Sequence, residues 1–403
     1  MPGHGFRLDT DFRKLWIGQI ISEVGSRISR EGIPLTAALT LQVTAPQMSI
    51  LAALGSASAL LFSLFAGVIV DRTPRRPVLI GADIGRAVLL GTIPLAAILH
   101  WLNYWQLVIV AALTGILTVL FDVAYQSYLP SLVKPEALAE GNRILGMGSA
   151  TAEILGPGLT GILVTAISAP LAIGIDAASF LVSSASVIAI RGRETIRAPS
   201  VQSHWLEEAL AGAKVIRERP LLRALALRAM TAFLCMGSAF SFYIFYAVRD
   251  LGMSRIALGF TIALGGVGAL LGAWLAERIS NRLGTGHAFF TATIFMGLAY
   301  LLIPAAGLYP SHAIWFLGSQ QLFGDFAWSL YAVNEIVLRQ RVTPPELLGR
   351  VNAAMQIASR GMLPIGALIA GVLTSFISVQ SAMWIGAVGI LLSGLWLWPV
   401  RNE

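Results

Sequence analysis

Twelve long apolar stretches constrain the fold of this chain more than any other feature of its sequence. They cover roughly residues 15–40, 47–70, 78–100, 104–126, 143–168, 170–190, 224–248, 256–276, 287–308, 312–336, 351–377 and 380–399. A helix that crosses the hydrocarbon core of a bilayer needs about 20 mostly apolar residues. Charged residues make up only 12% of the chain, against about 25% in soluble domains. The pattern therefore predicts an all-α membrane protein with twelve transmembrane helices, and not the alternating strands of a barrel.

The 28 Lys and Arg residues are distributed unevenly over the segments that flank these spans. With the N-terminus inside, 21 of them fall in cytoplasmic segments or at inner span ends, and two, Arg249 and Arg255, fall outside. Cytoplasmic loops of membrane proteins carry an excess of Lys and Arg. This predicts a multi-pass protein of the cell's inner (cytoplasmic) membrane with both termini cytoplasmic. The net charge of +7 follows from this topology, so we expect the lipid bilayer and no nucleic acid among the partners.

The longest polar stretch, residues 191–223, divides the spans six and six. We therefore expect an N-terminal six-helix bundle over residues 1–190 and a C-terminal six-helix bundle over residues 224–403. The stretch between them is predicted to be a cytoplasmic linker that contains an amphipathic helix on the inner membrane surface.

The two halves also repeat one another in sequence. Residues 134–148 match residues 344–358, and residues 70–76 match residues 276–282 at a nearly equal offset. Two pseudo-symmetric six-helix bundles are typical of secondary transporters, whose central site lies between the repeats.

Several segments resemble motifs of the major facilitator superfamily, in particular its drug:proton antiporter-3 branch. They are GVIVDRTPRR (67–76), GADIGRA (81–87) and YLPSLVKPEALAEGN (128–142). That branch includes macrolide exporters and enterobactin-type siderophore exporters. ILGPGLTG (154–161) is similar to the span-5 exporter motif, which points to Gly156, Pro157 and Gly161. FDVAYQSYLP (121–130) departs from the pattern, because it lacks the arginine-led motif of some proton-coupled drug exporters. The resemblance covers the whole chain and implies the facilitator fold and transport by alternating access.

Asp71 ends the second span among arginines, where a carboxylate opposes the helix dipole. The start of span 11 offers a positive helix end, Arg76 offers a salt bridge, and Gly67 would let another helix approach closely. The resemblance implies a cytoplasmic latch in this loop, and the alternative is a passive loop anchor. The predicted latch set is Gly67, Asp71, Arg72, Arg76, Asp83 and Arg86, with Glu277, Arg278 and Arg282 as the counterpart in the second half.

Charged residues also lie inside the spans, where each must face a cavity or a partner. Glu23, Arg27 and Arg30 share one face of span 1. They form either a self-neutralising Glu23–Arg27 pair, favourable at a spacing of four, or a wall of the transport cavity.

Glu153 lies in the middle of span 5, beside Gly156 and Pro157, where a proline can bend the helix. It is the first candidate for a proton-coupling carboxylate, followed by Glu23 and Asp325. The alternative is a packed acid that pairs with Arg360 or another base. The residues expected to line the cavity or contact substrate are Arg27, Asp122, Gln126, Gln356, Arg360, Phe242, Tyr246, Phe323 and Trp328.

Together these features predict a secondary active exporter of bulky amphipathic small molecules that works by proton antiport. A siderophore or lipid-like metabolite exporter is the alternative, and a nutrient importer or a membrane sensor fits less well. The sequence contains no phosphate-binding Gly-Lys loop and no metal-binding spacing of His or Cys. We therefore expect no enzyme, no cofactor and no metal, and a monomer whose partners are its substrate, protons and lipid.

Overall fold

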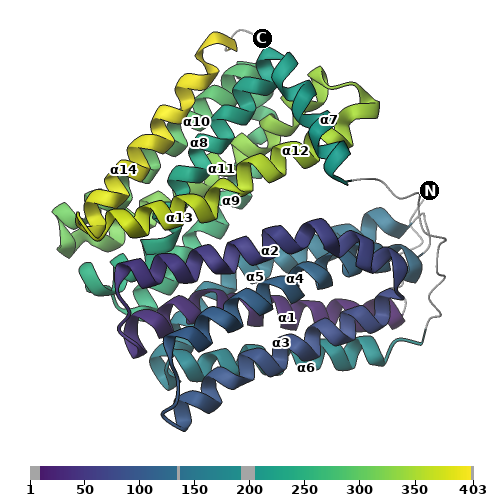
Figure 1. The fold of residues 1–403 in the computed structure, drawn as a ribbon, viewed down its shortest axis with the longest axis vertical. Coiled ribbons are helices and arrows are strands. Elements are labelled where there is room, and N and C mark those ends of the chain that lie inside the picture. Colours follow the sequence, from purple (N-terminus) through teal and green to yellow (C-terminus); the bar gives the residue numbers. More distant parts are fainter. Residues whose placement is uncertain (1–9, 134–136, 192–204, 401–403) are drawn as a thin grey trace. The chain divides into compact units, whose positions relative to one another are not determined.

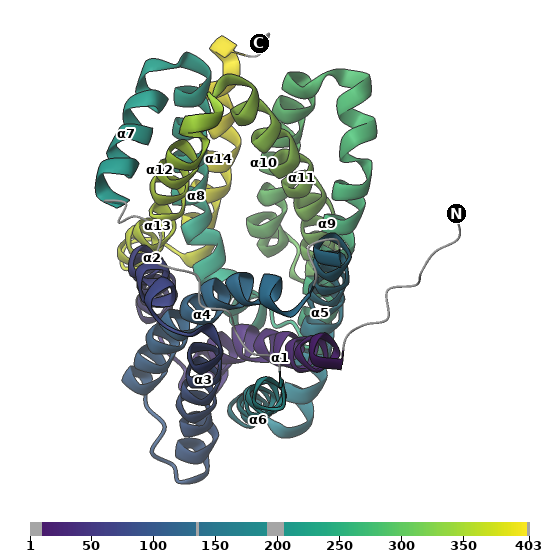
Figure 2. The ribbon, with the colours of Figure 1, turned by 90° about the vertical axis from the view of Figure 1, so that its right-hand side faces the viewer.

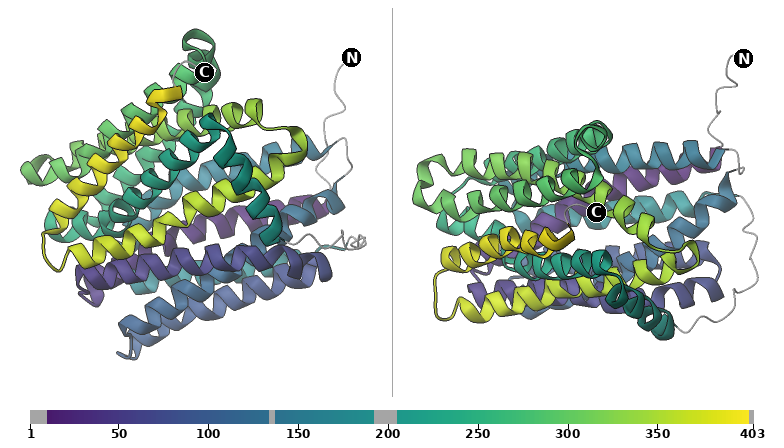
Figure 3. Two further views of the ribbon diagram at one scale, coloured as in Figure 1. Left: turned by 45° about the horizontal axis from the view of Figure 1, so that its top comes forward. Right: turned by 90° about the horizontal axis from the view of Figure 1, so that it is seen from above.

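The computed structural model describes residues 10–133, 137–191 and 205–400. Every regular segment in these ranges is a helix, and no strand occurs among them (Figures 1 and 3). The predicted all-α fold is confirmed. The side chain of Asp71 lies outside the described set, as do those of Trp205 to Ala209.

The first six predicted spans correspond to six long helices. They are α1 (Thr10–Leu35), α2 (Ala45–Arg72), α3 (Arg75–Ile98), α4 (Tyr104–Leu132), α5 (Leu138–Ile167) and α6 (Ala169–Ile188). A π-helical turn, η1 (Thr36–Thr40), extends α1. Asn103 begins α4 by accepting a hydrogen bond from the Gln106 backbone N–H at 3.0 Å, which satisfies one of the free donors of the first turn.

The second half begins with a short helix, α7 (Trp205–Glu218), inside the predicted linker. The spans that follow are α8 (Pro220–Phe245), α9 (Arg255–Leu283), α10 (Thr285–Ala305), α11 (Ala313–Val342), α12 (Leu348–Arg360), α13 (Met362–Leu373) and α14 (Val379–Leu392). Shorter turns are η3 (Tyr246–Asp250), η4 (Ala306–Leu308), η5 (Pro310–His312), η6 (Pro345–Leu347) and η7 (Ser393–Val400).

The eleventh predicted span is divided into α12 and α13 at Gly361. Pro364 lies in the first turn of α13 and has no N–H to give to the carbonyl of Arg360. The sequence predicts one continuous helix here, and the proline explains the difference.

Ten of the described helices are long and apolar enough to cross a membrane. Helices α1 and α11 have the length, 26 and 30 residues, but carry more polar side chains. At 1.5 Å per residue they extend about 39 and about 45 Å, more than the roughly 30 Å of a hydrocarbon core. The polar side chains of α1 are those that form the candidate site described below.

The chain forms two compact units. The first contains Met1–Thr36 and Leu61–Gln202, and the second contains Ala37–Leu60 and Ser203–Glu403. Helix α2 thus contributes its first part to the second unit. The domain boundaries expected from the sequence, which keep residues 37–60 with the N-terminal bundle, stay a prediction.

In the first unit, α1 packs against α6 through glycines spaced seven residues apart (Figure 2). A β-carbon at Gly18 would lie 2.7 Å from the Cβ of Ser186, and one at Gly25 would overlap the Ser179 hydroxyl. Small residues at such positions let helices in a membrane approach closely. The seven-residue spacing of these glycines is visible in the sequence, but the helix that packs against them becomes evident only in the structure.

The internal repeat is visible in the turns that end the first span of each half. The π turns η1 and η3 begin at Thr36 and Tyr246, which have the same separation as the matching segments that begin at residues 134 and 344. Both are followed by a residue in the left-handed region, Gln42 with φ 50° and Gly252 with φ 65°. The bonds from Val43 N to Ala37 O, 3.1 Å, and from Met253 N to Ala247 O, 2.9 Å, are related in the same way. The repeat therefore holds for backbone conformation as well as for sequence.

Candidate functional site

Two glycines of α5 bring that helix close to α1. A β-carbon at Gly156 would overlap the side-chain stem of Arg27, and one at Gly148 would lie 2.9 Å from Ile20. Gly156 belongs to the Gly-Pro motif noted in the sequence. Because Gly156 has no side chain, Arg27 of α1 can lie against α5.

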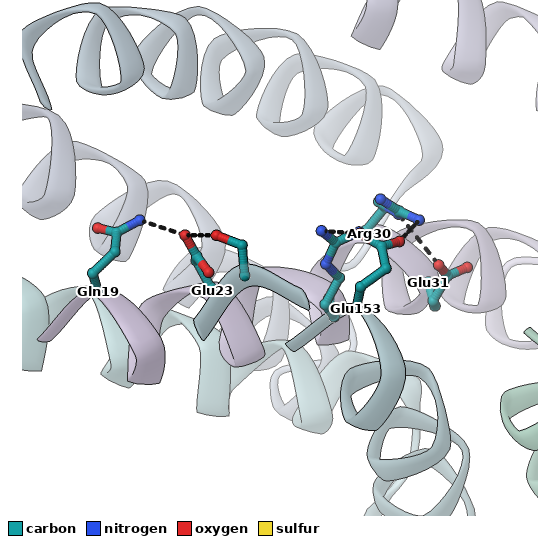
Figure 4. A network of polar contacts seen from close by, with 7 residues as sticks. Gln19, Glu23, Arg30, Glu31 and Glu153 are labelled. Carbon is teal, nitrogen blue, oxygen red and sulfur yellow. Dashed lines mark hydrogen bonds and ion pairs between the residues drawn. The ribbon is translucent and has the colours of Figure 1, made fainter. Parts of the chain in front are cut away.

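A network of ion pairs occupies this contact (Figure 4). Arg27 forms an ion pair with one carboxylate oxygen of Glu153, and Arg30 Nη2 lies 3.3 Å from the other. Arg30 also pairs with Glu31, at 3.4 Å from Nε to Oε1. The Glu153 side chain is 40% exposed, whereas that of Arg27 is 19% exposed. One carboxylate of α5 therefore holds two arginines of α1.

Glu23 lies apart from this network and contacts neutral groups. Its Oε1 accepts hydrogen bonds from the Ser149 hydroxyl at 2.8 Å and from the Gln19 amide at 3.2 Å. Figure 4 shows Glu23 with Gln19 on one side and Glu153 with Arg30 and Glu31 on the other. No residue described in the structure forms an ion pair with Glu23. Of the two alternatives for this face, the Glu23–Arg27 pair is not formed, because α5 supplies Glu153 to Arg27.

The sequence leaves open which base pairs with Glu153. The structure supplies Arg27 and Arg30 from α1, and it places Arg360 exposed at the end of α12. Arg27, Arg30, Glu31 and Glu153 balance one another in charge. A balanced cluster is stable in a low-dielectric region, where unpaired charges are costly.

Three residues of this site were not singled out from the sequence: Gln19, Ser149 and Glu31. Gln19 precedes Glu23 by four residues, and Ser149 precedes Glu153 by four, so each lies on the same helix face as an acid. That spacing is the signal that identifies them. Glu31 follows Arg27 by four residues, so the same spacing places it on the face of a charged residue of α1.

Of the predicted latch, the side chain of Asp71 alone is not described. Arg76 Nη2 donates to the Ile188 carbonyl at 2.6 Å and so ties the start of α3 to the end of α6. A β-carbon at Gly67 would meet no described atom within 4 Å, and the close approach of another helix there stays a prediction. The Asp71 carboxylate lies outside the described side chains, and Arg72 is exposed.

Asp83 and Arg86 form a buried pair inside the first unit. Arg86 Nη2 lies 2.5 Å from Asp83 Oδ1, and the two side chains are 4% and 0% exposed. The guanidinium lies over the rings of Phe121 and Phe180, at 4.4 and 4.0 Å from their centroids. These contacts join α3, α4 and α6.

The counterpart residues in the second unit, Glu277, Arg278 and Arg282, are all exposed near the end of α9. Arg278 lies 4.6 Å from the centroid of the Trp274 ring. Their role as a second latch stays a prediction.

The aromatic residues expected around a substrate differ in their surroundings. Phe242 and Tyr246 are buried, and the Tyr246 hydroxyl donates to the Pro304 carbonyl at 3.3 Å. They pack within the second unit, and their contact with the cavity or substrate stays a prediction. Trp328 stands between Phe233 and Tyr331, at 5.8 and 5.5 Å between ring centroids.

The other predicted contact residues are more accessible. Phe323 is exposed on α11 and lies 6.0 Å from Phe295. Asp122 and Gln126 are exposed on α4, and Gln356 is exposed on α12.

The carboxylate of Asp325 on α11 lies against α9 at Gly265. A β-carbon at Gly265 would overlap the Asp325 carboxylate. The predicted mid-span acid of α11 thus lies at the contact between α9 and α11.

A family model described as Major Facilitator Superfamily matches residues 15–364. The chain belongs to the major facilitator superfamily. It is a multi-pass membrane transporter and not an enzyme. The resemblance seen in the sequence motifs is thereby confirmed.

Relatives of this superfamily member include named efflux proteins. The multidrug efflux pump Tap of Mycolicibacterium fortuitum is 26% identical over 361 residues, which cover 86% of this chain and 85% of Tap. Macrolide efflux protein A of Streptococcus pyogenes is 24% identical over 401 residues, which cover 97% of this chain and 96% of that protein.

A solved structure of a variant of the nucleoside transporter NupG matches with a TM-score of 0.81. The match covers 98% of this chain and 100% of that chain at 10% identity. At this identity the likeness establishes the fold alone.

Proposed function

We propose that this transporter exports bulky amphipathic small molecules by alternating access, driven by proton antiport. Its efflux relatives at 24% and 26% identity and the Gly156–Pro157–Gly161 motif support export. The observation that carries the proposal is the polar contact between α1 and α5, which holds two acids in different surroundings. Both termini lie in the cytoplasm, the membrane is the inner one, and the working unit is a monomer.

The contacts of the two acids assign them different roles. Glu153 neutralises Arg27 and Arg30, so a proton on Glu153 leaves Arg27 without its carboxylate and Arg30 with Glu31 alone. Glu23 is bound by a hydroxyl and an amide, so a proton on Glu23 leaves both Arg27 and Arg30 paired with Glu153. We therefore assign the coupling proton to Glu23 and the joining of α1 to α5 to Glu153.

This assignment reverses the order of candidates expected from the sequence, which placed Glu153 first. It also links the coupling proton to helix packing. The Glu23 carboxylate reaches α5 through Ser149, so protonation changes a contact between the same two helices that Glu153 joins. A change in charge at Glu23 thereby biases the position of α1 against α5.

The test uses everted membrane vesicles that accumulate a labelled macrolide when a proton gradient is imposed. We expect Glu23→Gln, which mimics the protonated acid, to abolish uphill accumulation and to preserve macrolide exchange without a gradient. Glu153→Gln removes the partner of two arginines and should lose both activities. Glu140→Gln is the matched control on α5, because Glu140 pairs with Arg143 outside the network.

Uphill accumulation by Glu23→Gln at the wild-type rate would contradict the assignment of the proton. Absence of macrolide exchange in the wild-type protein would contradict the proposed substrate class, whatever the variants do.

A further inference from the structure

An arginine on α8, Arg228, is enclosed in the second unit with 0% of its surface exposed. Its guanidinium carbon lies 3.8 Å from the centroid of the Tyr331 ring on α11, and the face of an aromatic ring attracts a cation. None of its three nitrogens makes a hydrogen bond of acceptable geometry to any residue that the structure describes. Buried polar groups normally have a partner, so this arginine requires an explanation.

The acid on the same face of α11 is Glu335, one turn beyond the Tyr331 ring that Arg228 covers. Its carboxylate is already engaged, because Arg339 Nη1 lies 2.9 Å from Glu335 Oε1. Residues four apart share one face of a helix. Tyr331, Glu335 and Arg339 are therefore aligned along α11, with Arg228 of α8 at the Tyr331 end.

One carboxylate thus has Arg339 in contact with it and Arg228 beside the preceding turn of α11. The Glu335 and Arg339 side chains are only 12% and 15% exposed, so water replaces little of their interaction. Arg339 Nε is also buried without a partner among the described residues. An unpaired buried charge is costly, and a nearby opposite charge offers compensation.

We propose that Glu335 exchanges its ion-pair partner between Arg339 and Arg228 as the second unit changes conformation. The inference rests on the proposed transport cycle, which requires at least two conformations of each unit. Rotation about the side-chain bonds of Glu335 moves its carboxylate from the turn of Arg339 to the turn of Tyr331. Glu335 then acts as a positioning residue that joins α8 to α11 in one state and leaves α8 unattached in the other.

The two arginines differ in what they lose when released. Arg339 lies in the last turn of α11, where the helix dipole and free carbonyl groups favour a cation. Arg228 lies in the middle of α8 and has no such compensation. In the structure, Glu335 pairs with Arg339. Arg228, which has the poorer alternative, is the arginine without a carboxylate among the described residues.

The test is a double-mutant cycle on the melting temperature of the purified full-length protein, measured without substrate or proton gradient. The variants are Arg228→Gln, Arg339→Gln and the double variant, with Arg228→Met in parallel to preserve packing of the stem. If Glu335 can use either arginine, each single variant keeps one ion pair and the double variant keeps none. We expect the double variant to lose at least about 3 °C more than the sum of the single losses.

Arg228→Lys in the Arg339→Gln background is the matched control, because lysine restores a cation beside Glu335. It should recover most of the additional loss. Additive losses would overturn the exchange and leave Glu335–Arg339 as a static pair. A melting temperature that rises with chloride in the wild type and loses this response in Arg228→Gln would also overturn it, since an anion would then be the partner of Arg228.

A transport measurement distinguishes positioning from stability alone. Arg339→Gln leaves Arg228 as the only partner of Glu335 and should slow macrolide export about tenfold, a change that needs only a small bias between states. Failure of all macrolide export together with a non-additive cycle would refute the substrate class and retain the exchange.

Discussion

Arg86 in the first unit and Arg228 in the second are both buried over aromatic rings, but only one has its own acid. Arg86 pairs with Asp83 one turn away and lies between Phe121 and Phe180. Arg228 has Tyr331 beneath it, and the acid one turn further along α11, Glu335, pairs with Arg339. A guanidinium with a dedicated carboxylate fixes the helices around it. Under the proposed exchange, a guanidinium that shares a carboxylate leaves its helices with two arrangements.

The largest expected effect comes from removing the arginine that has its own acid. Arg86→Met leaves Asp83 buried without a base and should destabilise the protein by about 3–5 kcal/mol. Thermal unfolding of purified protein, together with its yield in membranes, measures this. Asp83→Leu combined with Arg86→Met removes both charges and should recover most of the loss. Equal stability of Arg86→Met and the wild type would show that the pair contributes nothing.

A smaller effect is expected when the charge pair is kept and one ring is removed. Phe180→Leu takes away one of two aromatic faces around Arg86 and leaves a small cavity, for a loss of about 1–3 kcal/mol. Tyr331→Leu is the matching change beneath Arg228. If the Tyr331 ring is the main compensation for Arg228, its removal should cost at least as much as that of Phe180. The opposite order would mean that Arg228 has a stronger partner than the ring.

The smallest effect is expected for Arg228→Met. The substitution removes a buried cation that has no hydrogen-bond partner among the described residues and leaves the Glu335–Arg339 pair in place. Replacement of poorly compensated buried charge by an apolar side chain is often neutral or stabilising. We expect the melting temperature to stay within about 2 °C of the wild type or to rise. A loss as large as that of Arg86→Met would erase the contrast between the two arginines.

The elements of the fold were predictable because their signal is local. A run of apolar residues determines a span wherever it occurs, and the offset between the segments that begin at residues 134 and 344 also relates the π turns η1 and η3. The break at Gly361 was readable in principle from Pro364. The contacts of the site were less accessible, since they depend on which helix lies beside which. Spacing along α1 favours a Glu23–Arg27 pair, yet Arg27 turns to Glu153, four helices later in the chain.

The same limit applies to Arg228 and the glycines of α1. The sequence places a cation inside a span but contains no information on α11 as its neighbour. Glycines spaced seven residues apart indicate close helix packing, but the spacing does not identify α6 as the partner helix. Charge and size are properties of single residues, whereas compensation is a property of the assembled helices.

The first part of α2 has a consequence for biogenesis. The side chain of Leu60 lies 3.6 Å from where a β-carbon on Gly361 would be, so the two residues are neighbours. Gly361 is synthesised only near the end of translation. At about 5–20 residues per second, the ribosome needs about 15–60 s to travel from the leucine to the glycine. During this interval the emerging hairpin of α1 and α2 rests in the lipid or against the insertion machinery without its final neighbour. A chaperone or protease that monitors nascent membrane proteins has its longest opportunity at this helix.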